Sequence, residues 1–158
     1  MKHLGIDIGS TTVKIAIIDE KNNILYSEYK RHFAKIKETL RELLENAIAK
    51  IGDMNVAAEI TGSGGLALSN VIGIPFEQEV VCVSTALKTY APKTQVAIEL
   101  GGEDAKIIYF SKHGIEQRMN SVCAGGTGSF IDQMAALRGQ AVQLLQFTSE
   151  KTETNQVK

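Results

Sequence analysis

Short hydrophobic runs separated by polar turns make up the opening segment of this 158-residue chain. The runs are rich in β-branched side chains, which favour strands, and they are too short to favour helices. The polar residues at 19–23 lie between two of them and are typical of a tight turn. We therefore expect an antiparallel meander of strands over residues 3–8, 13–18 and 24–30.

The segment 34–51 has the clearest helical pattern of the chain. Its apolar residues recur at spacings of three and four, so they fall on one face of a helix, and charged residues take the other face. The residues predicted to form the apolar face are Ile36, Leu40, Leu43, Leu44, Ala47, Ile48 and Ile51. Gly52 and Asp53 follow directly and are expected to end the helix.

The opening pattern of strands recurs later in the chain, after a further strand and two helices. Apolar runs between glycine or proline breaks predict a strand over 56–60, helices over 66–72 and 78–90, strands over 95–100, 105–110 and 115–120, and a helix over about 129–137. The order strand, acidic glycine-containing turn, strand, turn and strand therefore occurs twice. This mixture of strands and helices predicts an α/β protein.

The repeated order also predicts two related lobes. We expect residues 1–93 to form the first lobe and residues 94–147 to begin a second lobe that is incomplete. The last segment, 148–158, is polar and has no apolar periodicity, so it is expected to be a polar tail. Each lobe would then carry one of the two acidic glycine-containing turns.

Composition and charge exclude several classes of protein. Hydrophobic residues make up 44% of the chain and charged residues 22%, which is ordinary for a globular protein. The net charge is −1, so nucleic acid and anionic membranes are not expected partners. The chain has no apolar run of about 18 residues that would span a membrane, and its N-terminus has no signal-peptide pattern. We therefore expect a cytoplasmic protein.

The first acidic turn, DIGSTTVK at residues 7–14, has the chemistry of a phosphate site. Small residues allow backbone N–H groups to approach an anion closely, and hydroxyls and a lysine add further donors. Asp7 would repel phosphate but can bind the hydrated Mg²⁺ that accompanies it. The other candidate ligands are Gly9, Ser10, Thr11, Thr12 and Lys14. Taken alone, the segment could also be an ordinary hairpin.

The second acidic turn, ELGGEDAK at residues 99–106, has the same arrangement of an acid at the end of a strand, small residues and then a lysine. Gly101, Gly102 and Glu103 are its candidate cofactor-binding residues, and Glu99 and Asp104 are both candidates to orient an attacking water. Two such turns facing each other would hold a magnesium-bound polyphosphate between them, which is most of what phosphoryl transfer requires. The chain has neither a GxxxxGK[ST] loop nor a GxGxxG turn, so P-loop and Rossmann sites are disfavoured.

The two turns resemble the phosphate-1 and phosphate-2 motifs of the actin/hexokinase/Hsp70 superfamily. Within it, residues 119–132 (MNSVCAGGTGSFID) resemble the cysteine motif of the BadF/BadG/BcrA/BcrD ATPase family, and residues 61–64 (TGSG) resemble that family's Thr-Gly-x-Gly turn. The resemblance covers about residues 3–136 and fades after about Leu137. It implies a ribonuclease H-like ATPase fold, a mixed sheet with helices on both faces.

The resemblance also implies an activity. Family members are homodimeric activators that bind ATP or ADP with Mg²⁺ and carry one [4Fe–4S] cluster on the two-fold axis. ATP hydrolysis drives an electron into a 2-hydroxyacyl-CoA dehydratase or a related reductase. Cys123 occupies the position of one cluster ligand. No cysteine follows it, so two chains would supply two of the four thiolates needed, and the cluster is doubtful in this chain.

Two other functions stay open from the sequence. A sugar or acyl kinase of the same superfamily would share the phosphate turns, although the cysteine motif argues against it. A catalytically silent fragment that binds nucleotide or only self-associates is the other alternative. Cys82 is interpreted as a small packing residue on a helix. The three histidines, which lack partners at ligand spacing, are interpreted as surface or strand residues without a catalytic role: His3, His32 and His113.

Overall fold

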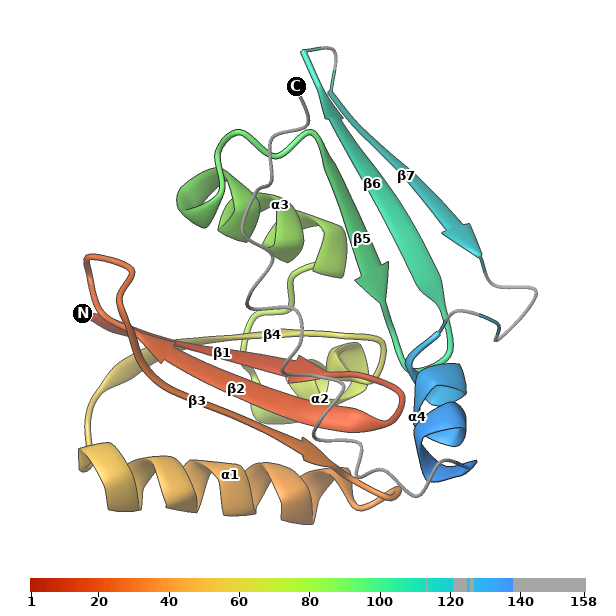
Figure 1. The fold of residues 1–158 in the computed structure, drawn as a ribbon. Helices are drawn as coiled ribbons and strands as arrows, with labels where there is room; N and C mark the ends of the chain where they lie inside the picture. Colours follow the sequence, from red (N-terminus) through yellow and green to blue (C-terminus); the bar gives the residue numbers. More distant parts are fainter. Residues whose placement is uncertain (113, 121–124, 126, 138–158) are drawn as a thin grey trace. The chain divides into compact units, whose positions relative to one another are not determined.

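The computed structural model describes residues 1–112, 114–120, 125 and 127–137. The chain divides into two compact units, Met1–Gln95 and Val96–Lys158, and each is described here by itself (Figure 1). His113, Cys123 and the predicted tail over 148–158 lie outside the described residues. In the described part of the chain, no helix has both the length and the apolar character of a membrane span.

The first unit is built on a four-stranded mixed sheet. Its strands are β1 (Lys2–Ile8), β2 (Thr12–Ile18), β3 (Ile24–Arg31) and β4 (Val56–Thr61), in the order β3-β2-β1-β4. The first three strands form the predicted antiparallel meander, and β4 pairs with β1 in parallel. Both β1 and β4 therefore end at the same edge of the sheet, which is where the first acidic turn lies.

Helices cover both faces of this sheet, as the superfamily resemblance implies. They are α1 (Ile36–Ile51), α2 (Gly65–Ile72) and α3 (Glu79–Tyr90). Helix α1 packs on β2 and β3, and α2 packs on β4 and β1. The start of α2 lies against the side chain of Ile60. The next residue of β4, Thr61, points to the other face, where it interacts with Cys82 of α3; Figure 1 shows α1 and α3 on opposite sides of the sheet.

The buried face of α1 is narrower than its sequence pattern predicts. Leu40, Leu43 and Ala47 are buried against the sheet, but Ile48 is 52% exposed. Ile48 lies one residue, and therefore about 100° around the helix, beyond Ala47, so it sits at the margin of the apolar stripe. The prediction that Ile48 belongs to the core face is wrong.

A conservative pair of substitutions tests where the core lies. Ile15 of β2 is 2% exposed, whereas Ile24 of β3 is 62% exposed. Ile15→Val removes one buried methyl group and is expected to lower the free energy of unfolding by about 0.5–1.5 kcal/mol. The matched control Ile24→Val should change it by less than about 0.5 kcal/mol. Urea denaturation of both variants measures the difference, and equal effects would contradict this assignment of the core.

The second unit repeats the meander. Strands β5 (Val96–Leu100), β6 (Ala105–Ser111) and β7 (Gly114–Asn120) form an antiparallel sheet, and α4 (Gly128–Leu137) follows. Ile108 of β6 and Ala135 of α4 are buried. These elements agree with the predicted strands and helix to within one or two residues.

Candidate functional site

The first acidic turn is a tight hairpin between β1 and β2. The Gly9 N–H donates to the Thr12 carbonyl at 2.9 Å, so Ser10 and Thr11 form the tip of the turn. Asp7 lies directly opposite Lys14 across the two strands. The Lys14 Nζ donates to Asp7 Oδ2 at 2.7 Å, and both side chains are partly exposed. The structure therefore brings the predicted acid, hydroxyl residues and cation of this turn together at one edge of the sheet.

Gly62 packs closely against the end of β1, beside Asp7. Its φ is +95°, a backbone conformation that other residues rarely adopt. A Cβ at this position would lie 2.3 Å from the Ile8 carbonyl oxygen and 2.5 Å from Asp7 Oδ1. The Gly64 N–H donates to the same Ile8 carbonyl at 2.8 Å. The Thr-Gly-Ser-Gly turn thus packs directly against the end of β1, and a side chain at Gly62 would displace either the Ile8 carbonyl or the Asp7 carboxylate.

Cys82 of α3 lies close to this end of the sheet. Burial raises the pKa of its thiol, interaction with Thr61 partly opposes that rise, and the carboxylates of Glu77, Glu59 and Asp7 raise it further. The Thr61 hydroxyl is buried and does not form a hydrogen bond of ordinary geometry with the thiol. A raised pKa keeps the group a neutral thiol at neutral pH, which agrees with the interpretation of Cys82 as a packing residue.

His32 is the residue of this site that the sequence analysis missed. It is 7% exposed and follows the last residue of β3, so its interpretation as a surface or strand histidine is wrong. Its Nε2 lies 3.2 Å from the Gly9 carbonyl oxygen, and its Nδ1 accepts from the Ala34 N–H at 3.0 Å. Its backbone N–H donates to the Thr11 carbonyl at 3.1 Å. The contacts with Gly9 and Thr11 join residues more than twenty positions apart, so no local spacing in the sequence signals them.

The second acidic turn has the same hairpin geometry in the second unit. The Gly101 N–H donates to the Asp104 carbonyl at 2.8 Å, as Gly9 does to Thr12. Glu99 lies opposite Lys106, in the same register as Asp7 and Lys14. The Lys106 Nζ lies 3.9 Å from Glu99 Oε1 and 3.5 Å from Asp104 Oδ2. Both hairpins therefore hold an acid and a lysine as a cross-strand pair.

The start of α4 is attached to this second hairpin. The Gly128 N–H donates to the Gly101 carbonyl at 2.7 Å, and the Ser129 N–H donates to the Gly102 carbonyl at 3.1 Å. A Cβ on Gly128 would lie 3.0 Å from the Gly101 oxygen. Because trans peptides are planar, the N–H groups that follow these carbonyls, those of Gly102 and Glu103, point away from α4. These two N–H groups are therefore candidate anion donors of the hairpin.

Metal ligation by the described residues is limited. Within 1–112, 114–120, 125 and 127–137, no three histidine, cysteine, aspartate or glutamate side chains gather as ligands of one ion. Mg²⁺ usually keeps several of its waters in proteins, so a single carboxylate such as Asp7 is compatible with a hydrated Mg²⁺. Cys123, the candidate cluster ligand, lies outside the described residues.

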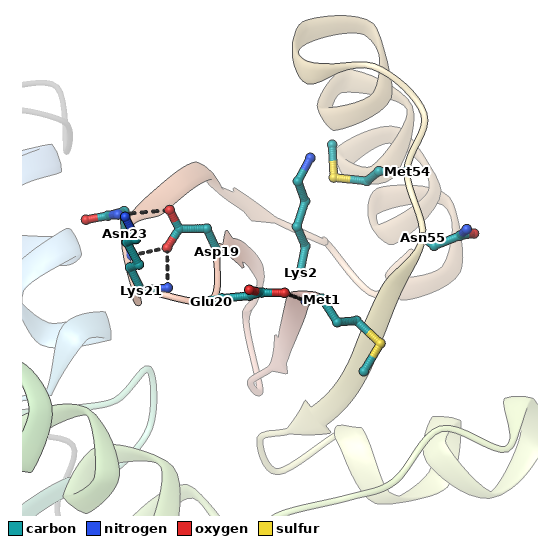
Figure 2. Close-up of a pocket in the computed structure, with 8 residues that line it drawn as sticks. All are labelled: Met1, Lys2, Asp19, Glu20, Lys21, Asn23, Met54 and Asn55. Atoms are coloured by element: carbon teal, nitrogen blue, oxygen red, sulfur yellow. Dashed lines mark hydrogen bonds and ion pairs between the residues drawn. The ribbon is translucent and has the colours of Figure 1, made fainter.

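A hollow of about 620 Å³ lies elsewhere on the first unit (Figure 2). Residues at the start of β1, in the turn between β2 and β3, and just before β4 line it. Asp19 Oδ1 accepts from the backbone N–H groups of Lys21 and Asn23, each at 2.8 Å. Hydrogen bonds from Asn23 lower the pKa of the Asp19 carboxyl, so this acid stabilises its own turn. The hollow is at the opposite end of β1 from Asp7 and is not part of the candidate site.

Several known proteins are similar to this chain in both sequence and fold. The (R)-2-hydroxyglutaryl-CoA dehydratase activating ATPase of Acidaminococcus fermentans is 31% identical over 84% of this chain. The structure of the activator of the 2-hydroxyisocaproyl-CoA dehydratase from Clostridium difficile, with bound ADPNP, matches with a TM-score of 0.80 and 27% identity over 98% of this chain. Component A of the A. fermentans dehydratase matches with a TM-score of 0.73 and 26% identity over 97% of the chain.

These matches confirm the predicted actin/hexokinase/Hsp70 type of ATPase fold. The chain covers 52% of the first relative's length, and 58% and 60% of the two solved chains. The model of one protein family, the BadF/BadG/BcrA/BcrD ATPases, matches residues 4–157. The match continues past Leu137, so the prediction that the resemblance fades there is wrong. Since nearly the whole sequence matches this family model, the chain belongs to the BadF/BadG/BcrA/BcrD ATPase family.

Proposed function

We propose that this chain is the nucleotide-binding region of an ATPase that activates a 2-hydroxyacyl-CoA dehydratase or a related reductase. The observation that carries the proposal is the shared geometry of the two hairpins. In each hairpin an acid lies opposite a lysine, and a glycine N–H donates to a backbone carbonyl across the turn. The names of the relatives support it, because one is an activating ATPase and another was solved with bound ADPNP.

Each hairpin has a proposed role toward ATP or ADP. Asp7 holds the water shell of Mg²⁺, and the phosphate ligands of the first hairpin are Gly9, Ser10, Thr11, Thr12 and Lys14. When bound, Mg²⁺ neutralises charge on the phosphate oxygens. On the second hairpin Gly102 and Glu103 donate backbone N–H groups, and the Gly101 N–H closes the turn. Glu99 or Asp104 orients the attacking water, and Lys106 holds both carboxylates in place.

The partners and the redox group also belong to this proposal. A homodimer would bring two copies of Cys123 together as candidate ligands of a [4Fe–4S] cluster, which supplies a low-potential electron when bound. Two copies of Cys123 are two of the four thiolates that such a cluster requires, so further ligands must come from elsewhere. The proposed electron acceptor is the dehydratase or reductase component.

Nucleotide titration tests the proposal directly. Mg-ATP and Mg-ADP should raise the melting temperature, because ligand binding stabilises the folded protein by an amount that grows with the logarithm of ligand concentration and reaches about 2.7 kcal/mol at 100 times Kd. EDTA should remove most of the effect. Release of inorganic phosphate measures turnover, and anaerobic reconstitution with iron and sulfide, followed by visible absorbance, measures cluster binding.

The outcomes separate the proposed function from its alternatives. Stabilisation without phosphate release would support the silent nucleotide-binding fragment. Phosphate transfer to a sugar or an acyl acceptor would support the kinase. No stabilisation by either nucleotide would contradict the proposed nucleotide site altogether.

A further inference from the structure

A turn with unusual backbone geometry joins β3 to α1, next to the first hairpin. Phe33 and Ala34 have φ values of 45° and 64°, and the Lys35 N–H donates to the His32 carbonyl at 2.7 Å. Two consecutive residues with positive φ are normal for asparagine or glycine, and they are unfavourable for phenylalanine and alanine. Strained backbone of this kind persists where the surrounding contacts hold it, and such positions cluster at functional sites.

The side chain of His32 holds this turn on one side and the first hairpin on the other. Because Nδ1 accepts from the Ala34 N–H, Nδ1 carries no proton. The proton of the neutral ring is therefore on Nε2, which donates to the Gly9 carbonyl at 3.2 Å. The His32 backbone N–H holds a second hairpin carbonyl, that of Thr11, at 3.1 Å. One residue thus fixes the direction of two peptide groups in the hairpin.

The direction of the Gly9 carbonyl determines where the next donor points. In a planar trans peptide, the C=O of Gly9 and the N–H of Ser10 point in opposite directions. Holding the carbonyl against His32 therefore turns the Ser10 N–H away from the protein interior, and Ser10 itself is exposed. An outward N–H at the tip of this hairpin is a donor for a phosphate oxygen.

The second hairpin holds the equivalent carbonyl in a different way. Gly101 occupies the position of Gly9, and its carbonyl accepts from the Gly128 N–H of α4 at 2.7 Å. The same peptide group is therefore anchored in both hairpins, by a histidine side chain in one and by a helix N-terminus in the other. The donors differ, but both hold the carbonyl of the equivalent glycine. This indicates that both hairpins depend on the orientation of the peptide group after that glycine.

From these contacts we infer that His32 is a positioning residue of the nucleotide site, which acts by orienting the Gly9–Ser10 peptide toward phosphate. The inference rests on the proposed function, since it names the first hairpin as a phosphate ligand. It assigns His32 no contact with the nucleotide and no proton transfer.

Three variants test the inference. His32→Ala removes the donor, His32→Gln keeps an N–H donor at nearly the same reach, and His3→Ala is the control at an exposed histidine of β1. Calorimetric titration with Mg-ADP should give a Kd that is about tenfold weaker for His32→Ala, mostly restored for His32→Gln and unchanged for His3→Ala. A loss of affinity of equal size in His32→Ala and His32→Gln, with both folded, would overturn the inference.

Two spectroscopic readouts do not depend on nucleotide. The ¹⁵N pattern of the imidazole should show the tautomer protonated on Nε2, and the opposite tautomer would overturn the inference. The Ser10 amide resonance should shift in His32→Ala and return toward its original position in His32→Gln. If the original protein failed to bind Mg-ADP, the proposed function would fail, whereas an unmoved Ser10 amide would overturn the positioning role alone.

Discussion

Gly62→Ala is expected to destabilise the first unit by about 2–5 kcal/mol and to abolish binding of magnesium nucleotide. Two causes act together. A left-handed backbone costs an alanine about 1–2 kcal/mol, and overpacking adds about 1–3 kcal/mol. The overpacking arises because the new Cβ would lie 2.3 Å from the Ile8 carbonyl oxygen and 2.5 Å from Asp7 Oδ1. Either the Thr-Gly-Ser-Gly turn moves away or the Asp7 carboxylate does, and both changes alter the site.

Gly73→Ala is the matched control for this prediction. Gly73 has a φ of +70° in the left-handed region, and nothing lies within 4 Å of a Cβ at its position. The backbone penalty is about 1–2 kcal/mol, but no clash is added. Chemical denaturation gives the free energy of unfolding, and titration with Mg-ADP under conditions where both variants are folded gives the affinity. Equal losses of stability, with nucleotide affinity kept in Gly62→Ala, would show that the close packing of this turn against Asp7 has no role in binding.

Asp7→Asn is expected to weaken the binding of Mg-ATP by about 10–100-fold, the range seen when a group that holds a metal indirectly is lost. The fold should remain, because the pair between Asp7 and Lys14 is partly exposed and such pairs contribute about 0–1 kcal/mol. Calorimetric titration with Mg-ATP, and with ATP in EDTA, measures the metal-dependent part of the affinity.

Asp53→Asn removes the same charge from an exposed position just after α1 and is the control for Asp7→Asn. It should leave the affinity for Mg-ATP unchanged at moderate ionic strength, where charges on distant surfaces are screened. An Asp7→Asn variant that binds as tightly as the Asp53→Asn control would remove the proposed metal role of Asp7. A weakening that is equal with and without EDTA would assign the effect to phosphate rather than to metal.

Local periodicity was sufficient to predict the elements of both units. The alternation in β1 and β2 and the apolar spacing in α1 are imposed by the period of each structure, so they can be found without knowledge of the fold. The start of α1 illustrates the limit of this approach. The helical pattern extends back to Ala34, but the helix begins at Ile36 because Phe33 and Ala34 take positive φ values.

The candidate site was predictable only where its chemistry is local. The acid, glycine and lysine of each hairpin are close together in the sequence, so their cross-strand pairing follows from the turn length. Strands β2 and β3 separate His32 from Gly9 in the sequence, and only the fold brings the two together. Gly62 was noticed as part of a motif, but its position against Asp7 depends on the parallel pairing of β1 with β4.

The hydrogen bonds that attach α4 to the second hairpin have a consequence for mutagenesis. Two run from the backbone N–H groups of Gly128 and Ser129 to the carbonyls of Gly101 and Gly102, and the Ser129 hydroxyl also donates to the Gly102 carbonyl. Truncating Ser129 to alanine would remove the hydroxyl contact and leave both backbone bonds intact, so it would underestimate the junction. A residue that adds bulk at Gly128, where a Cβ would lie 3.0 Å from the Gly101 oxygen, tests the backbone contact itself.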